Sequence, residues 1–396
     1  MILNEATQKF IREHLHADVR QLALLAHRYQ TQEIDFPFAL SQIAGRQQIE
    51  HKIPSWRDRD DLLFPARLPL EQCSSEATAQ YKALLVSGDS LADLTGGFGV
   101  DTAFLAPRFS QVFYVEKQTE LAAIAQHNFS SLGLNHIQIH TGDGLTFLKT
   151  MPPVDYIYLD PARRSSSGKK VWLIEDCEPD LLQIQMQLLD KARFVLIKFS
   201  PMLDIQAVCR TLKNISAMHV VSVENECKEL LFLLENQPVK ELKLTCVNLR
   251  KQGNQTDTFL FPEEKEAQIV YSSEVKKYLY EPNTSILKAG MYKSLALRYN
   301  IDKLHSDSHL YTSEQLISGF PGRIFEVENI ISFRKNDLKT HLHGLAQANL
   351  AIRNFPSTVA ELRKKLHLSE GGDVYLFATT LAGGQRVLVR GRKMLV

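Results

Sequence analysis

The stretch Leu91-Ala-Asp-Leu-Thr-Gly-Gly-Phe-Gly-Val-Asp101, followed by Val112-Phe-Tyr-Val-Glu116, decides the fold class. An apolar segment leads into Asp93, three glycines follow, and a helical pattern precedes the next apolar segment, which predicts strand, turn, helix and strand. Glycines in such a turn let the backbone approach a ligand closely. Glu116, at the end of the second strand, is placed to accept hydrogen bonds from two ribose hydroxyls. Taken alone, the pattern is equally compatible with a tight turn and a solvated glutamate.

The same alternation of strand and helix continues downstream. Strands are predicted at 90–94, 111–116, 137–140, 156–160 and 194–197, and helices at 101–107, 118–132, 144–149 and 178–191. This order is typical of an α/β fold with a doubly wound, mostly parallel, Rossmann-like sheet. The apolar runs at 219–235 and 242–249 lack a full helix between them, which predicts an antiparallel edge of that sheet.

The flanking regions have different patterns. Residues 2–50 show apolar positions at helical spacing, which predicts several short helices, and Ser74 or Ser75 can cap a helix that begins near Glu76. The polar segment 251–268 predicts a surface hairpin or linker. The remainder predicts a C-terminal α+β unit, with helices at 283–299, 338–348 and 358–366, short strands at 324–333 and a final strand pair. The expected domains are 1–79, 80–262, 270–325 and 326–396.

Composition bounds the class of protein. The chain has 396 residues, of which 44% are hydrophobic and 23% charged, as in an ordinary globular protein of several domains. A net charge of +1 gives no global reason for a polyanionic partner. The N-terminal stretch mixes charges into its apolar positions, and no apolar run is long enough to span a bilayer. Five scattered cysteines without a CxxC pair predict reduced thiols in the cytoplasm and no metal site.

Four carboxylates follow successive predicted strands. Asp93 ends the first strand, Glu116 the second, Asp143 follows the third, and Asp160 ends the fourth. In an open parallel sheet, ligands bind outside the carboxyl ends of the strands where the strand order reverses. We therefore expect these four side chains to line one crevice.

The ordered set Asp93-Leu-Thr-Gly-Gly-Phe-Gly, Tyr114-Val-Glu-Lys, Gly142-Asp-Gly and Asp160-Pro-Ala-Arg resembles the class I S-adenosylmethionine-dependent methyltransferases over about residues 80–245. The resemblance implies S-adenosylmethionine as the cofactor. It also implies site residues, carried over position by position: Asp93, Thr95, Gly97 and Gly99 beside the methionine moiety, Glu116 on the ribose, Asp143 at the adenine amino group, and Asp160, Pro161 and Arg163 in the target pocket. Direct transfer from a sulfonium requires alignment and exclusion of water, but no metal and no covalent residue. A dehydrogenase would instead want a G-x-G-x-x-G turn.

The fourth motif bears on the methyl acceptor. Enzymes with Asp-Pro-Pro-Tyr at this position methylate exocyclic amines of nucleobases, whereas this chain reads Asp160-Pro-Ala-Arg-Arg and lacks the second proline and the aromatic ring. An arginine can stack on a base or pair with a phosphate. The basic loop 163–170 is equally compatible with a substrate clamp and a solvated loop. Lys198-Phe-Ser-Pro201 belongs either to the pocket rim or to a turn. Cys177, at a predicted helix start, is not expected to be a nucleophile.

The C-terminal region carries further resemblances. Arg353-Asn-Phe-Pro and Gly371-Gly-Asp-Val-Tyr-Leu-Phe-Ala-Thr resemble a THUMP-like domain of bacterial methyltransferases, and Glu281-Pro-Asn-Thr-Ser-Ile-Leu-Lys-Ala-Gly resembles the ferredoxin-like domain that accompanies it. Gln72-Cys-Ser-Ser-Glu76 is similar to the N-terminal region of the same group. From Lys339 to the end, nine basic residues face three acidic ones, which suits a phosphate-facing surface as well as a basic surface without a ligand.

These observations predict a methyltransferase that acts on a base nitrogen in RNA, either tRNA or rRNA. Two alternatives remain open: an RNA-binding protein whose transferase site has decayed, and a methyltransferase for a small molecule or a protein.

Overall fold

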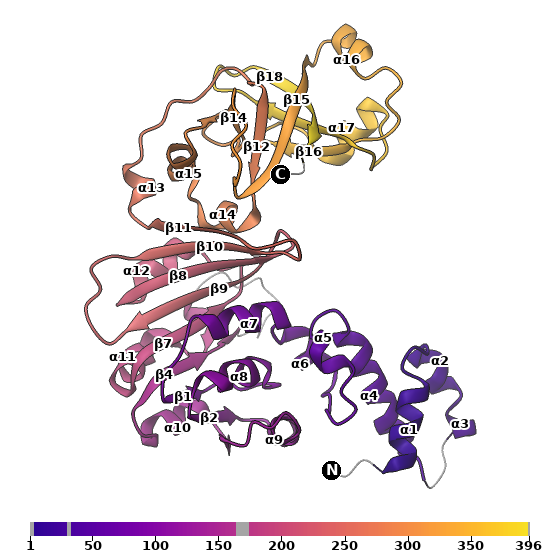
Figure 1. The fold of residues 1–396 in the computed structure, drawn as a ribbon, viewed down its shortest axis with the longest axis vertical. Coiled ribbons are helices and arrows are strands. Elements are labelled where there is room, and N and C mark those ends of the chain that lie inside the picture. The colour runs from indigo at the N-terminus through magenta and orange to yellow at the C-terminus, as the bar shows by residue number, and fades with distance from the viewer. Residues whose placement is uncertain (1–3, 30–32, 164–173, 395–396) are drawn as a thin grey trace. The chain divides into compact units, whose positions relative to one another are not determined.

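The computed structural model describes residues 4–29, 33–163 and 174–394, which form two compact units (Figure 1). The first unit comprises Met1–Ser216 and Glu229–Lys240, and the second comprises Ala217–Lys228 and Glu241–Val396. All four strand-end carboxylates belong to the first unit.

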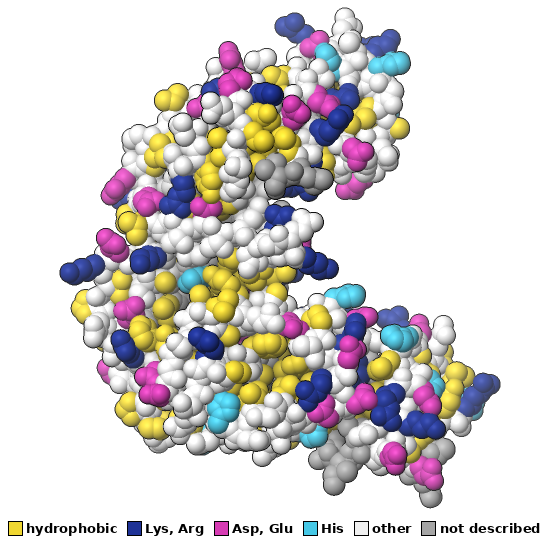
Figure 2. Space-filling model, in the orientation of Figure 1, with side chains coloured by type: hydrophobic (Ala, Val, Ile, Leu, Met, Phe, Trp, Pro, Cys, Tyr) yellow, Lys and Arg dark blue, Asp and Glu magenta, His cyan; other side chains and the backbone are white. Residues whose placement is uncertain are grey.

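The chain begins with the predicted short helices. They are α1 (Glu5–Glu13), α2 (Val19–Leu24), α3 (Ala26–Tyr29), α4 (Phe36–Ile49), α5 (Pro54–Arg57), α6 (Arg67–Gln72) and α7 (Glu76–Leu84). Asn4, Asp18, Asp35 and Ser75 cap four of them by accepting hydrogen bonds from backbone amides of the first turn. Phe10, Ile43 and their apolar neighbours form a small core among α1, α2 and α4. On the face that Figure 2 shows, basic, acidic and histidine side chains are interspersed over these helices.

A nine-stranded sheet follows, with the order β11-β10-β8-β9-β7-β4-β1-β2-β3. Its parallel part consists of β1 (Ser90–Asp93), β2 (Gln111–Glu116), β3 (Ile137–Thr141), β4 (Val154–Leu159) and β7 (Ala192–Phe199). The intervening helices are α8 (Val100–Leu105), α9 (Thr119–Ser131), α10 (Gly144–Thr150) and α11 (Leu181–Lys191), with α12 (Ile205–Thr211) after β7 and the 3-10 turn η1 (Ala106–Arg108) after α8. Successive residues of β1, β2 and β4 are buried, as expected when both faces of a parallel sheet are covered. The predicted doubly wound α/β class is confirmed.

The other edge of this sheet contains antiparallel pairs, as predicted, although β8 and β10 pair in parallel. It is built from β8 (Ile215–Val223), β9 (Glu226–Glu235), β10 (Lys243–Leu249) and β11 (Gln255–Leu260), with β9 antiparallel to β7 and β11 antiparallel to β10. The segment 251–268, predicted as a surface hairpin or linker, contains the turn and the second strand of the β10–β11 hairpin, and helix α13 (Glu263–Glu266) follows. The sequence did not indicate a strand at β11 because the segment is polar and includes an acid. That acid, Asp257, is buried and accepts hydrogen bonds from Arg298 and Tyr299.

A further correction concerns the predicted helix at 178–191. Helix α11 begins at Leu181 and is capped by Asp180, whereas Cys177–Glu178 forms β6, antiparallel to β5 (Ala162–Arg163), after the 3-10 turn η2 (Ile174–Asp176). Cys177 is therefore a buried strand residue, not a thiol at a helix start.

The C-terminal part of the second unit is α+β, as predicted. Its sheet has the order β13-β14-β12-β15-β18-β17-β16. The strands are β12 (Tyr278–Pro282), β13 (Asp302–Lys303), β14 (Tyr311–Ser313), β15 (Gly322–Ser332), β16 (Asn349–Arg353), β17 (Val374–Thr380) and β18 (Arg386–Lys393). The helices are α14 (Thr284–Ala289), α15 (Tyr292–Tyr299), α16 (Lys335–His341) and α17 (Val359–Leu366).

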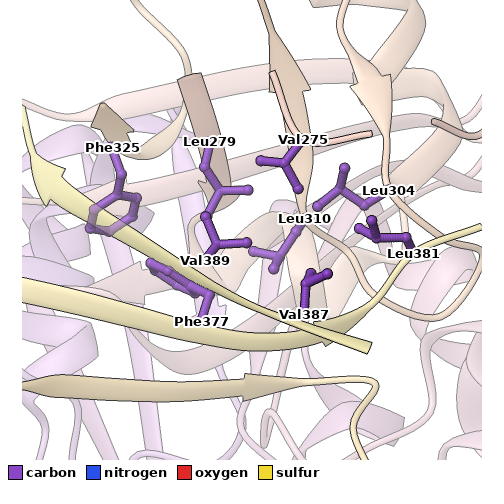
Figure 3. Close-up of a cluster of buried hydrophobic side chains, with 9 residues drawn as sticks. All are labelled: Val275, Leu279, Leu304, Leu310, Phe325, Phe377, Leu381, Val387 and Val389. Atoms are coloured by element: carbon purple, nitrogen blue, oxygen red, sulfur yellow. The ribbon is translucent and has the colours of Figure 1, made fainter. Parts of the chain in front are cut away.

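Three details of this region differ from prediction. The helix expected at 283–299 is divided into α14 and α15, because Gly290 adopts a left-handed conformation with φ of 77° and ends the first helix. The short strands expected at 324–333 are one long strand, β15, and the helix expected at 338–348 lies earlier, as α16. Figure 3 shows Leu279, Phe325, Phe377 and Val389, from four adjacent strands, directed toward one another in the core of this sheet.

Candidate active site

The strand order brings the predicted site residues to one edge of the sheet. The chain runs outward from β1 through β2 to β3, whereas β4 lies on the opposite side of β1, so the strand order reverses between β4 and β1. The carboxyl ends of β1, β2, β3 and β4 are therefore neighbours, and Asp93, Glu116, Asp143 and Asp160 follow them. Such a reversal is where open α/β sheets bind ligands.

The glycine turn is packed closely against β2. The Gly96 amide donates to the Val115 carbonyl at 2.9 Å, and the Tyr114 hydroxyl donates to the Gly97 carbonyl at 2.6 Å. A Cβ at Gly96 would lie 2.2 Å from the Tyr114 ring, so only glycine fits there. At Gly97, where φ is 56°, a Cβ would meet nothing nearer than the Thr95 carbonyl at 3.8 Å. The turn thus leaves open space above Gly97, which suits a closely bound ligand.

Asp93 is buried beneath this turn and holds it through hydrogen bonds. Its side chain is 1% exposed; Oδ1 accepts from the Thr95 amide at 2.9 Å and Oδ2 from the Thr102 hydroxyl at 2.5 Å. Burial raises the pKa of Asp93 to about 7, although these hydrogen bonds oppose the rise. Thr95 in turn accepts a hydrogen bond from the Asp160 amide at 2.7 Å, which joins the glycine turn to the end of β4. Gly99, also left-handed, begins α8.

Glu116 and Asp143 lie at the ends of the next two strands. Glu116 is largely buried, and its two oxygens accept from the Gly97 and Gln118 amides at 2.8 Å each. Each carboxylate oxygen keeps a second acceptor position, enough for two hydroxyl donors. Asp143 is exposed and caps α10, where its Oδ1 accepts from the Thr146 amide and hydroxyl. These acceptors fit the ribose and the adenine amino group of S-adenosylmethionine.

Asp160 follows β4 and is paired with a lysine. Its Oδ2 lies 2.5 Å from Lys198 Nζ, and its side chain is 35% exposed. Pro161 is buried, and the Arg163 backbone pairs with Cys177 in the β5–β6 ribbon. Residues 164–170 of the predicted basic loop lie outside the described residues. Lys198, which the sequence placed either on the rim or in a turn, therefore belongs to the site.

A buried ionic network supports this pair. Lys198 Nζ lies 3.9 Å from Asp101 Oδ2, which also accepts from the Tyr158 and Ser74 hydroxyls at 2.7 and 2.8 Å. Asp101 Oδ1 lies 3.2 Å from Lys82 Nζ. Lys82 in turn donates to both oxygens of Glu229, at 2.7 and 2.8 Å. The sequence predicts the helix that contains Lys82 and the apolar run that contains Glu229, but it assigns neither residue a role in the site.

The charges in this network influence one another. For Asp160, burial raises the pKa and the Lys198 ammonium opposes the rise. For Lys198, burial disfavours the charged form, but Asp160, Asp101 and Glu229 together raise its pKa. For Asp101, Lys82 and Lys198 outweigh the effect of burial and lower the pKa, whereas burial dominates and raises the pKa of Glu229. The network therefore favours an ammonium at Lys198 beside a carboxylate that is partly open to solvent.

Residues 4–29, 33–163 and 174–394 contain no group of three or more histidine, cysteine or acidic side chains placed to hold a metal ion. The helices within these ranges also include none that is long and apolar enough to cross a membrane.

Comparison with known proteins gives three matching family models. A protein-L-isoaspartate (D-aspartate) O-methyltransferase model matches residues 72–166, a ferredoxin-like domain model matches 278–321, and a THUMP domain-like model matches 322–393. The first match covers all four strand-end carboxylates, and the other two cover the C-terminal sheet.

Two curated relatives are protein-L-isoaspartate O-methyltransferases. The one from Koribacter versatilis is 32% identical over 25% of this chain and 46% of its own length. The one from Brucella anthropi is 35% identical over 19% of this chain and 35% of its own length. The chain thus spans less than half of either relative.

A solved structure matches along the whole chain. A protein of Porphyromonas gingivalis W83, assigned as a methyltransferase, is 34% identical, with a TM-score of 0.89 and coverage of 100% of both chains. Together with the ordered motifs at the ends of β1 to β4, this match identifies the family. The chain belongs to the class I S-adenosylmethionine-dependent methyltransferases that carry C-terminal ferredoxin-like and THUMP-like domains.

Proposed function

We propose that this enzyme methylates a base nitrogen in RNA, either tRNA or rRNA, by direct transfer from S-adenosylmethionine. The observation that carries the proposal is the position of Asp160, which lies beside the glycine turn, bonded through its amide to Thr95 and through its carboxylate to Lys198. The THUMP domain-like match at 322–393 and the nine basic residues against three acidic ones from Lys339 onward support RNA as the substrate class.

On this proposal, the donor half of the site is formed by residues from three strand ends. Glu116 accepts hydrogen bonds from the ribose hydroxyls, Asp143 accepts one from the adenine amino group, and the turn from Asp93 through Thr95 and Gly97 to Gly99 surrounds the methionine moiety. S-adenosylmethionine supplies an activated methyl group on a good leaving group. The protein's remaining tasks are alignment of the two reactants and exclusion of water.

The acceptor half is formed by the end of β4. Asp160 accepts a hydrogen bond from the target base, buried Pro161 shapes the backbone beside it, and Arg163 stacks on the base or pairs with a neighbouring phosphate. A neutral base suits this position better than an anion, because the partly exposed Asp160 carboxylate repels a second negative charge.

The first experiment tests the donor site by calorimetry with S-adenosylhomocysteine. Glu116→Ala and Asp143→Ala should each weaken binding about 10-fold to 100-fold, the loss expected for a hydrogen bond to a charged group. Glu120→Ala, an exposed acid on the neighbouring helix, is the matched control and should bind like wild type. Unchanged affinity in both site variants would refute the assigned roles.

The second experiment tests the acceptor with labelled methyl transfer to RNA from a deletion strain. Wild type and Asp190→Ala, an exposed acid on α11, should label the RNA, whereas Asp160→Ala should not. The curated relatives motivate a second candidate, methylation of a protein carboxylate; label that survives nuclease but not protease would establish it. Absence of transfer to any acceptor, despite donor binding, would point to a decayed transferase site.

A further inference from the structure

We propose that Lys198 is a positioning residue that holds Asp160 as a charged hydrogen-bond acceptor, so that the methylated nitrogen must be one that carries a hydrogen. The inference rests on the proposed function and narrows its substrate class. It favours an exocyclic amine or a neutral ring N–H over a ring nitrogen without hydrogen, and over a carboxylate.

The position of Lys198 follows from the sheet. β7 runs parallel to β4, and Ile197 is in register with Leu159. Lys198 and Asp160 each follow one of these paired residues, so they lie side by side at the carboxyl end of β4. Lys198 is only 11% exposed, and its ammonium lies between Asp160 Oδ2 at 2.5 Å and Asp101 Oδ2 at 3.9 Å. A buried ammonium with two carboxylates has little freedom to move, so it restricts the Asp160 side chain as well.

The charges around Asp160 come from several elements. Lys198 belongs to β7, Asp101 to α8, Lys82 to α7 and Glu229 to β9, while Asp93 and the Tyr158 hydroxyl belong to β1 and β4. Two ammonium groups, Lys198 and Lys82, face the three carboxylates of Asp160, Asp101 and Glu229, so the acidic groups outnumber the basic ones. The remaining negative charge disfavours an anionic acceptor and favours a hydrogen-bond donor.

The reaction balances with these groups. The lone pair of the acceptor nitrogen forms the new N–C bond while the C–S bond breaks, and the electron pair of that bond stays on the sulfur. The nitrogen becomes positively charged and then loses the hydrogen that it had donated to Asp160. The Asp160 carboxylate accepts this proton and releases it to water. A nitrogen without hydrogen could neither donate a hydrogen bond to Asp160 nor pass a proton to it.

The first test needs no RNA. Protein labelled with 13C at aspartate carboxyl carbons is titrated by NMR, and the Asp160 signal is assigned by its absence in Asp160→Asn. We expect Lys198→Met to move the Asp160 midpoint upward by about one pH unit or more, as when an adjacent opposite charge is removed. Lys198→Arg should keep it near the wild-type value, and Lys213→Met, an exposed lysine, should not change it. An unchanged midpoint in Lys198→Met would overturn the role of Lys198.

Calorimetry with S-adenosylhomocysteine shows that each variant is folded, since Lys198 lies outside the proposed donor contacts. If Lys198→Met does not bind S-adenosylhomocysteine, Lys198→Arg is used for the test instead. A rise of about one pH unit or more in the Asp160 midpoint of Lys198→Arg would overturn the proposal, because the positive charge is still present in that variant.

The second test identifies the product. In methyl transfer to RNA, Lys198→Met should lower kcat at least about 10-fold, within the range for a misplaced proton acceptor, with KM for S-adenosylmethionine within about 2-fold. The acid limb of the kcat–pH profile of Lys198→Met should move to higher pH. Lys198→Arg should recover most of the activity. A methyl group found on a ring nitrogen that carried no hydrogen, or on a carboxylate, would overturn the substrate class. If wild type transfers no methyl to RNA but the Asp160 midpoint shifts as expected, the RNA proposal fails while the role of Lys198 stands.

Discussion

Replacement of Lys82 by methionine should destabilise the first unit strongly. Lys82 is fully buried and donates to both oxygens of Glu229 and to the Ser74 hydroxyl, while Asp101 lies 3.2 Å away. Methionine keeps most of the volume but leaves two buried carboxylates short of a partner. Removal of one member of a buried ion pair typically destabilises a protein by about 3–5 kcal/mol, and we expect a loss of this size at pH 7.

Urea unfolding followed by tryptophan fluorescence measures this loss. Trp56 is buried in the first unit, so its fluorescence reports the unfolding of that unit. Lys149→Met, on the exposed side of α10, is the matched control and should unfold like wild type.

Two further results follow from the same contacts. Lys82 opposes the burial that raises the pKa of Glu229, so without Lys82 this pKa should rise further. The stability deficit should then shrink as pH falls and folded Glu229 takes up a proton. The double variant Lys82→Met/Glu229→Leu should be more stable than Lys82→Met alone, because the second substitution removes an unpaired buried charge. A loss below about 1 kcal/mol in the single variant, or no recovery in the double, would refute the reasoning.

Three other predictions concern the turn, its carboxylate and the C-terminal sheet. Gly96→Ala should abolish S-adenosylhomocysteine binding in calorimetry and lower stability by about 1–3 kcal/mol, because its Cβ would meet the Tyr114 ring at 2.2 Å. The raised pKa of Asp93, about 7, implies that its contribution to stability is complete below pH 4 and is lost as pH rises toward 7. The melting temperature of Asp93→Asn should therefore fall less between pH 4 and pH 7 than that of the wild type. An equal fall in both proteins would contradict the raised pKa of Asp93. Glu281→Gln should lower stability by about 1.5–3 kcal/mol, because buried Glu281 pairs with Arg323 and Arg353. Faster hydrogen exchange in β12 and β15 would support this, and unchanged exchange would contradict it.

The parallel core of the fold was predictable because local sequence determines it. The segments around Asp93, Glu116 and Asp160 each combine an apolar strand with a polar residue at its carboxyl end, and parallel strands bring those ends together. The predicted strand 111–116 agrees with β2 at both ends. Segments with buried polar residues were harder, since β11 contains buried Asp257, whose partners lie about forty residues later in the chain.

The ionic network behind the site was not predictable from spacing. Lys82 and Glu229 are 147 residues apart and lie in different elements, so no local pattern connects them. Lys198 was recognised only as a rim or turn residue, because its contact with Asp160 depends on the register between β7 and β4. Long-range pairs of this kind arise from tertiary packing and require the structure.

The most direct test of the proposed function is a comparison of modified nucleosides by mass spectrometry. RNA from wild-type cells, deletion cells and deletion cells complemented with either the wild-type gene or Asp160→Asn would be digested and compared. We predict that one nucleoside methylated on nitrogen is absent from the deletion strain, returns with the wild-type gene and does not return with Asp160→Asn. Identical nucleoside profiles in wild-type and deletion cells would contradict the proposal that this enzyme methylates RNA.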